Sequence, residues 1–307
     1  MIKYTLQRLL QSLIVILAVV TVVFLLVRLS GNPARVIAPL GATHADILAI
    51  SNRLGLQNPL YVQYLTFLSQ LVRGDFGTSY GFQTSVGQLL TTALPYTAEL
   101  AVVAFAFASI VGVSLGTISA VKSGTWIDGV ARFIGLIGQS VPVFWLGIVF
   151  VLVFSVKLRL LPSFGAGSPD HLILPALALS LRPMASITRL SRSATLEALR
   201  ADYTLFERSK GVKQSVLMRH LLRNMSLPVI TLTGIQLADL LSGSVVIETL
   251  FGWPGMGLLA IQAINLRDYT VVQGVVTVDT IIVVLMNLLV DLSYGWLDPR
   301  VRRRVFA

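Results

Sequence analysis

Two aspartates lie within long apolar stretches of the sequence, where a charged side chain is costly and therefore informative. Asp239 stands in the middle of the apolar run 227–247, and Asp279 lies in the first half of the run 269–296. A charge at the centre of a bilayer costs about 2.5–3.5 kcal/mol on insertion scales, so both should face the protein interior or a water-lined path. There, a carboxylate can bind the ammonium group of a peptide or another cation. The alternative is a structural hydrogen bond or ion pair between helices, for example Asp239 with Arg182.

The sequence lacks the residue groups that several other chemistries need. It has no cysteine, which excludes disulfides, thiol catalysis and thiolate metal sites. The three histidines (His44, His171 and His220) are scattered, so we expect no metal site. No Gly-Lys dipeptide occurs, so the chain has no phosphate-binding loop and is expected to bind no nucleotide or other cofactor itself. An intramembrane enzyme is disfavoured, because no histidine lies in an apolar run and the two aspartates form no catalytic motif.

The elements that must position these residues are membrane helices. Of the 307 residues, 55% are hydrophobic and 12% charged, whereas soluble domains average about 25% charged. We therefore predict an all-α polytopic membrane protein with six transmembrane helices. The first, in residues 1–30, is longer than a signal-peptide core of about 7–15 residues and is interpreted as retained. The others are expected in a helical core over 98–299, at about 98–122, 131–157, 172–195, 227–250 and 269–297.

The positions of Lys and Arg predict the orientation of these helices. The formal net charge is +10, and the positive residues concentrate in the segments that face the cytoplasm if both termini are cytoplasmic, including the basic tail 300–307. Topology and contact with membrane lipid thus account for the basic charge. Nucleic-acid binding is not expected, because no interleaving of basic and aromatic residues is present.

Residues 31–97 form one long segment on the predicted extracytoplasmic side. Helical patterns at 45–54, after Thr43 as a possible N-cap, and at 60–71 predict a small helical insert. A turn is expected at 73–77 and another short helix at 86–94. Because long structured loops are commonly functional, the insert is interpreted as a docking surface; the alternative is a tether that packs on the membrane helices.

A charged, helix-prone stretch interrupts the apolar sequence at 196–226. Leu196, Leu199, Tyr203 and Phe206 share one helical stripe, Gly211 breaks the pattern, and a second amphipathic pattern follows up to the entry of the fifth span. Two short helices joined at Gly211 are predicted on the cytoplasmic side. Physics alone leaves two partners open, the anionic lipid surface and a soluble protein.

Two further features are candidates for the lining or gate of a pathway. Pro142 kinks the third span beside Ser140 and Trp145, and the kink either lines a cavity or serves packing alone. The segment 251–257 is rich in glycine and contains Trp253 and Pro254, which predicts either a re-entrant gate or an ordinary tight loop with an interfacial tryptophan.

Seven motifs, in order along essentially the whole chain, resemble one family. They are YTLQRLLQSLIVILAV, RGDFGTS (73–79), SVPVFWLG (140–147), DYTLFERSKGV with LMRHLLRNMSLPVI, VVIETLFGWPGMG (245–257), RDYTVVQG (267–274) and NLLVDLSYGWLDPRVR (287–302). The sequence is similar to permease subunits of binding-protein-dependent ABC importers, in the dipeptide/oligopeptide/nickel branch that includes glutathione and opine systems.

The resemblance implies a five-helix permease core preceded by an extra N-terminal span, in a bacterial inner membrane. It also implies a second homologous permease, two P-loop ATPase subunits that bind ATP and Mg, and an extracytoplasmic solute-binding protein. The stretch 196–226 would then hold the coupling helices, which dock into an ATPase. The residues that match this contact are Tyr203, Phe206, Glu207, Arg208, Lys210, Gly211 and Val212.

Two departures from the family pattern occur, and two alternative functions remain. Leu205-Phe206-Glu207 replaces the usual Arg-Thr-Ala or Glu-Ala-Ala, and Asn32 replaces an aspartate after the first span.

An importer of nickel or metal chelates fits the same family. A self-contained secondary carrier, using Asp239 and Asp279 as a proton relay, is the alternative from another class. The cargo is not specified by this chain.

Overall fold

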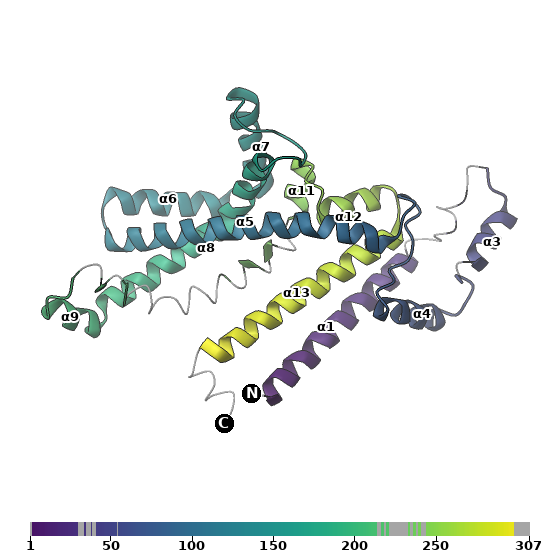
Figure 1. Cartoon of the computed structure of the whole chain (residues 1–307), viewed down its shortest axis with the longest axis horizontal. Coiled ribbons are helices and arrows are strands. Elements are labelled where there is room, and N and C mark those ends of the chain that lie inside the picture. The colour runs from purple at the N-terminus through teal and green to yellow at the C-terminus, as the bar shows by residue number, and fades with distance from the viewer. Residues whose placement is uncertain are drawn as a thin grey trace.

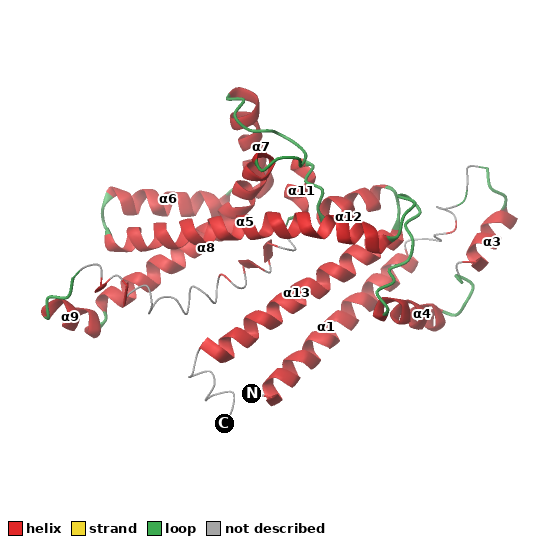
Figure 2. Ribbon diagram, viewed as in Figure 1, coloured by secondary structure: helices red, strands yellow, loops and turns green. Residues whose placement is uncertain are grey.

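The computed structural model describes residues 2–29, 41–53, 55–213 and 244–297, and single positions at 34, 38, 216, 217, 219, 220, 233, 236, 237, 239 and 240. In these ranges the chain is helical apart from turns and one isolated bridge between Thr78 and Ser85 (Figure 2). The elements are α1 (Ile2–Leu29), α3 (His44–Arg53), α4 (Leu60–Val72), α5 (Val86–Val121), α6 (Trp126–Ser140), α7 (Val143–Phe150), the π-helix η1 (Val151–Lys157), α8 (Asp170–Arg200), α9 (Asp202–Ser209), α11 (Val245–Phe251), α12 (Met256–Asn265) and α13 (Tyr269–Leu297).

The helices confirm the predicted all-α membrane fold. Within the described ranges, α1, α5, α8 and α13 are long and apolar enough to cross a membrane, and two bent pairs raise the number to six if each pair is one span. The bent pairs are α6 with α7–η1, at 109°, and α11 with α12, at 79°. Half of the predicted fifth span, 227–250, lies outside the described residues. The cytoplasmic placement of both termini stays a prediction.

Helix α5 differs from the sequence-based expectation. A short helix at 86–94 and a separate span from 98 were expected, but one helix of 36 residues contains both. Ser85 caps it by accepting a hydrogen bond from the Gln88 N–H at 3.2 Å. Pro95 removes one backbone hydrogen bond inside the helix, but apolar packing on both sides of it keeps the helix continuous. The predicted boundary of the insert at 97 therefore falls inside α5.

The third predicted span is interrupted. Pro142, for which a kink was predicted, instead stands between two helices, with Val141 extended before it. Extended backbone is what a residue preceding proline favours, and here it ends α6. The two halves of the span therefore point in very different directions (Figure 1).

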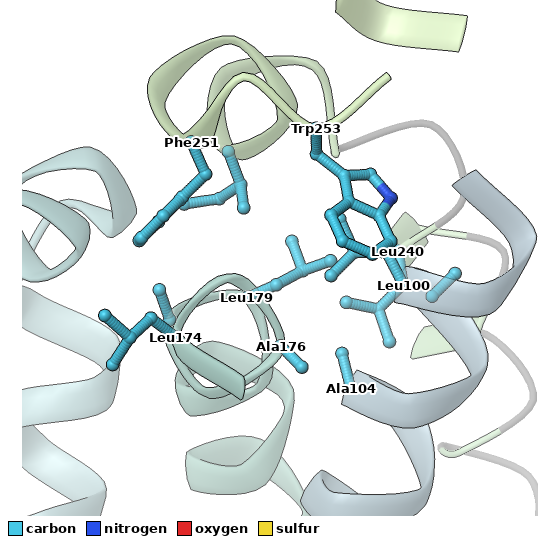
Figure 3. Packing of buried hydrophobic residues seen from close by; sticks show 11 residues of the cluster. Leu100, Ala104, Leu174, Ala176, Leu179, Leu240, Phe251 and Trp253 are labelled. Atoms are coloured by element: carbon cyan, nitrogen blue, oxygen red, sulfur yellow. The ribbon is translucent and has the colours of Figure 1, made fainter. Parts of the chain in front are cut away.

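The centre of the fold is the pair α5 and α8. Small residues allow close approach of the two helices: a Cβ added to Gly116 would collide with the backbone carbonyl of Thr188. The buried side chains of both helices form a core with the segment around Trp253 (Figure 3). Elsewhere α1 and α13 lie side by side (Figure 1).

The insert is helical, as predicted, and part of it packs on a membrane helix. Thr43 and Asp46 cap α3 reciprocally, with the Asp46 N–H donating to Thr43 Oγ1 at 3.3 Å and the Thr43 N–H donating to Asp46 Oδ2 at 2.9 Å. The Thr43 hydroxyl also donates to Asp46 Oδ2 at 2.7 Å, and this bond, together with that of the Thr43 N–H, lowers the pKa of Asp46. Helix α4 packs on α1, where the Phe24 and Tyr64 rings lie 5.3 Å apart. Helices α3 and α4 lie at the opposite end of the molecule from α9 (Figure 1).

A buried aspartate fastens the insert to the core. Asp268 precedes α13, and its Oδ1 accepts from the Val271 N–H at 3.2 Å. Its Oδ2 accepts from Ser79 Oγ at 2.6 Å and from the Gly81 N–H at 2.9 Å. The turn after α4 is therefore held against the start of the last membrane helix, α13.

Candidate functional site

The predicted coupling segment contains a short exposed helix, α9. The expected stripe from Leu196 to Phe206 is divided between two helices, because α8 continues to Arg200 and the chain turns at Ala201. Thr204 stabilises this turn: its buried hydroxyl donates to the Ala198 carbonyl at 2.6 Å. The first predicted coupling helix is therefore shorter than expected and is set at an angle to α8.

Helix α9 presents aromatic side chains and ends at a left-handed residue. Tyr203 and Phe206 are 37% and 59% exposed, and Lys210 Nζ lies 4.2 Å from the centre of the Phe206 ring. Gly211 has φ +73°, a conformation that suits glycine at a helix end. Val212 is half-buried, and Arg208 lies in α9.

Glu207 bridges the two predicted coupling helices. Its Oε1 lies 2.8 Å from Nδ1 of His220, which belongs to the second of them. Most of that second helix, over 214–226, lies outside the described residues. The departure from the family pattern at Glu207 thus makes a contact within the chain, across Gly211.

Asp239 and Arg182 line one cavity of about 800 Å³. Both side chains are exposed, and the cavity wall also contains Gln139 and Phe144, from the two sides of the α6–α7 break. The acid and the base that the sequence suggested as partners thus lie on one wall, with polar and aromatic side chains beside them.

The segment 252–255 joins α11 and α12 in a tight, anchored turn. Trp253 is buried, and its indole N–H donates to the Tyr96 carbonyl at 2.8 Å, while Pro254 is exposed. The Trp253 ring points from the turn toward Leu100 and Leu240 (Figure 3). The turn joins two helices bent by 79°, as in a broken span or a re-entrant loop, and Trp253 is a core residue of it. The gate stays a prediction.

A glutamate that the sequence analysis did not single out holds this turn together. Glu248 in α11 is fully buried, and its Oε1 accepts from Ser244 Oγ at 2.6 Å and from Thr97 Oγ1 at 2.8 Å. Its Oε2 accepts from the N–H groups of Gly257 at 2.7 Å and Leu258 at 3.2 Å. The carboxylate thus caps the N-terminus of α12, a position where negative charge is favourable. Through Thr97 it also links α12 to α5.

The glycine before α12 makes room for this carboxylate. A Cβ on Gly255 would lie 2.5 Å from Glu248 Oε2 and 2.5 Å from Thr97 Oγ1. In the sequence, Glu248 stands seven and nine residues before Gly255 and Gly257 of the same motif. This spacing is visible in the sequence, but the groups that Glu248 binds are visible only in the folded chain.

The other predicted pathway residues are not among the described residues that line the 800 Å³ cavity. Ser140 and Pro142 flank the α6–α7 break, and Trp145 is 50% exposed on α7. Asp279 is partly buried on α13. Among the described lining residues of that cavity, Asp239 is the one from the predicted pathway set.

A second ionic centre that the sequence analysis missed lies where α5, α6 and α8 meet. Asp128, 1% exposed, accepts from Arg192 Nε at 2.8 Å and Arg192 Nη2 at 3.0 Å. It also accepts from Ser119 Oγ at 2.6 Å and from the Gly124 N–H at 3.1 Å. These hydrogen bonds, those of Arg192 above all, stabilise the ionised carboxylate of Asp128.

Comparison with protein families identifies the family of this chain. Residues 1–101 match the N-terminal family of binding-protein-dependent transport system membrane components, and residues 112–303 match the family described as "Binding-protein-dependent transport system inner membrane component". The chain belongs to this permease family. The family assignment made from the seven motifs is confirmed, as is the prediction of a multi-pass protein of the bacterial inner membrane.

Individual relatives match the permease over almost its whole length. It is 38% identical to the dipeptide transport system permease protein DppB of Alkalihalophilus pseudofirmus, over 98% of this chain and 100% of that one. It is 37% identical to the glutathione transport system permease protein GsiC of Escherichia coli, over 98% and 99% of the two chains.

A solved structure supports the fold of the permease. The MetNI methionine ABC transporter, in inward-facing conformations, contains a chain that matches with a TM-score of 0.50 at 21% identity. The match covers 66% of the present chain and 95% of that one. The fold is thus that of an ABC importer permease, and as a permease subunit the chain belongs to the transport components rather than to the ATPases.

Proposed function

We propose that this permease forms half of the translocation pathway of an ATP-driven importer for peptides or related small solutes. An extracytoplasmic binding protein delivers the cargo, and a second homologous permease supplies the other half of the pathway. Two P-loop ATPase subunits bind ATP and Mg, since this chain has no loop that could cradle phosphates. The isolated chain is therefore expected to hydrolyse no ATP.

The observation that carries the cargo class is the cavity shared by Asp239 and Arg182. A peptide with free ends bears an ammonium and a carboxylate, and this wall offers one complementary charge for each. Phe144 and Leu240 add apolar surface for side chains of varied shape. The dipeptide and glutathione systems named for the relatives transport solutes of this kind, which supports the same class here.

Neutralising Asp239 should impair transport while leaving the protein folded. We expect Asp239→Asn and Arg182→Gln each to lower peptide uptake by about tenfold, the value of one charge-assisted contact of about 1.4 kcal/mol. Asp170→Asn, at an exposed acid of α8 outside the cavity, is the matched control and should transport normally. The measurement is uptake of labelled dipeptide in cells at equal expression. Full uptake by both Asp239→Asn and Asp279→Asn would remove the pathway role of these aspartates.

We further propose that α9 and the residues around Gly211 couple the permease to an ATPase. The exposed rings of Tyr203 and Phe206, with Lys210 beside them, support a protein contact better than a lipid contact, because Asp202 and Glu207 of the same helix would face anionic headgroups. The Glu207–His220 contact would hold the second coupling helix in a fixed position relative to α9.

Replacing Gly211 should weaken the contact between the permease and the ATPase. Gly211→Ala places a Cβ in open space but at φ +73°, which costs about 1–2 kcal/mol and favours a different chain path after α9. We expect co-purification of the ATPase to fall several-fold with Gly211→Ala and with Glu207→Ala. Gly87→Ala, at a helical glycine whose Cβ would meet nothing, is the control. Undiminished co-purification in both variants, or transport by the lone permease under a proton gradient, contradicts this assignment.

A further inference from the structure

A second cavity, of about 470 Å³, lies between α6 and α8. It is on the side of the α6–α7 break that leads toward α9, the end predicted to be cytoplasmic. Gln139 contributes to this cavity and to the Asp239 cavity, but the two have different chemistry. Three arginines line the second cavity: Arg132 from α6, and Arg189 and Arg192 from α8.

The charge of this wall is only partly compensated. Among the described residues that line the cavity none is acidic. The nearest compensating acid is Asp128, which is buried behind the wall and binds Arg192 with both carboxylate oxygens. Arg132 lies 3.6 Å from the same carboxylate, so one negative charge faces three positive charges. A net positive charge remains at the cavity, and this charge favours the binding of an anion.

The guanidinium groups keep hydrogen-bond donors available for such an anion. Arg192 uses Nε and Nη2 for Asp128, and Arg189 uses Nη1 for Gln139 Oε1 at 2.8 Å. Within the described part of the chain, Nη1 of Arg192 and Nη2 of Arg189 have no hydrogen bond. Fixed guanidinium groups with spare N–H donors match the oxygens of a phosphate group. Ser193 adds a hydroxyl to the same wall.

We propose that this cavity binds a phosphate group. Basic pockets between membrane helices on the cytoplasmic side are where anionic headgroups bind. Leu136 and Leu196 give the cavity an apolar side, and α6 exposes Phe133 and Leu136 by 63% and 64% next to Arg132, a surface on which acyl chains can lie. The phosphate belongs to an anionic phospholipid or to a soluble phosphate compound. The site goes beyond the proposed transport function and does not depend on which cargo is carried.

The test uses the full-length chain purified in detergent, with two separate probes. Native mass spectrometry counts the molecules of phosphatidylglycerol and, in parallel, of diacylglycerol, a lipid without phosphate, that the chain retains. Thermal unfolding in dodecyl maltoside micelles, which contain no phosphate, measures stabilisation by inorganic phosphate against chloride at matched ionic strength. The variant is Arg132→Gln/Arg189→Gln, which leaves the Asp128–Arg192 pair intact. Arg200→Gln is the matched control, since Arg200 is exposed on the same helix α8 but does not line the cavity.

We expect the wild type and Arg200→Gln to prefer phosphatidylglycerol, and the double variant to bind it about tenfold more weakly or worse. Stabilisation by inorganic phosphate that is lost in the same variant, without a preference for phosphatidylglycerol, assigns the site to a soluble phosphate. Equal retention of both lipids together with no effect of phosphate overturns the proposal, and so does an equal loss in Arg200→Gln. If the double variant fails to fold, Arg132→Gln alone serves, because that side chain is 60% exposed.

Discussion

Replacing Glu248 by alanine is expected to destabilise the permease by about 4 kcal/mol and to abolish uptake. The substitution leaves the buried Gly257 N–H and the part-buried Leu258 N–H without an acceptor, and an unsatisfied buried donor costs about 1–3 kcal/mol. It also removes the acceptor shared by Ser244 and Thr97. Total stabilities are only about 5–15 kcal/mol, so a loss of this size is large. The link between α5, α11 and α12 would be lost with it.

A graded pair of variants separates this capping role from a simple loss of volume. Glu248→Gln keeps one carbonyl oxygen for the two N–H groups and can turn its amide toward the two hydroxyls, which then accept. We therefore expect Glu248→Gln to retain most of the stability that Glu248→Ala loses. Glu99→Ala, at an exposed glutamate two residues after Thr97, is the control and should unfold like the wild type. The readout is the thermal unfolding midpoint in detergent. Equal midpoints for Glu248→Ala and Glu99→Ala would disprove the capping role.

The membrane helices could be predicted from the sequence because their signal is local. Runs of about 20 apolar residues are sufficient to locate α1, α5, α8 and α13. The breaks were harder to predict. Pro142 marked a defect in the third span, but composition does not give the 109° bend between α6 and α7–η1. In α5 a break was expected near Pro95 but is absent, because Pro95 lies inside a helix that packing keeps continuous.

The residues of the candidate sites were predicted less completely, because their chemistry depends on partners far away in the sequence. Asp239 and Asp279 stood out as charges in apolar runs. Glu248 is equally isolated among apolar residues, but its partner Thr97 is 151 residues away. Asp128 is 64 residues from Arg192. The Arg182–Asp239 proximity was predictable, since these are two opposite charges that must both avoid lipid, whereas a cap at a broken helix requires knowledge of the break.

The ion pair of Asp128 with Arg192 is the second place where a single change should have a large effect. We expect Asp128→Asn to lower the stability by about 2–3 kcal/mol, because it leaves the Arg192 charge without its bidentate partner. The figure is at the low end for buried pairs, since the Arg192 side chain is 25% exposed. Arg132→Gln is the matched comparison: it also removes a contact with Asp128, but an exposed one, and should cost little.

A double-mutant cycle tests whether the pair, and not the shape of Asp128, is what stabilises the junction of α5, α6 and α8. Asp128→Asn/Arg192→Gln removes both charges, so it should be more stable than the sum of the two single losses predicts, by about 1–3 kcal/mol. Additive losses would show that the charges do not interact.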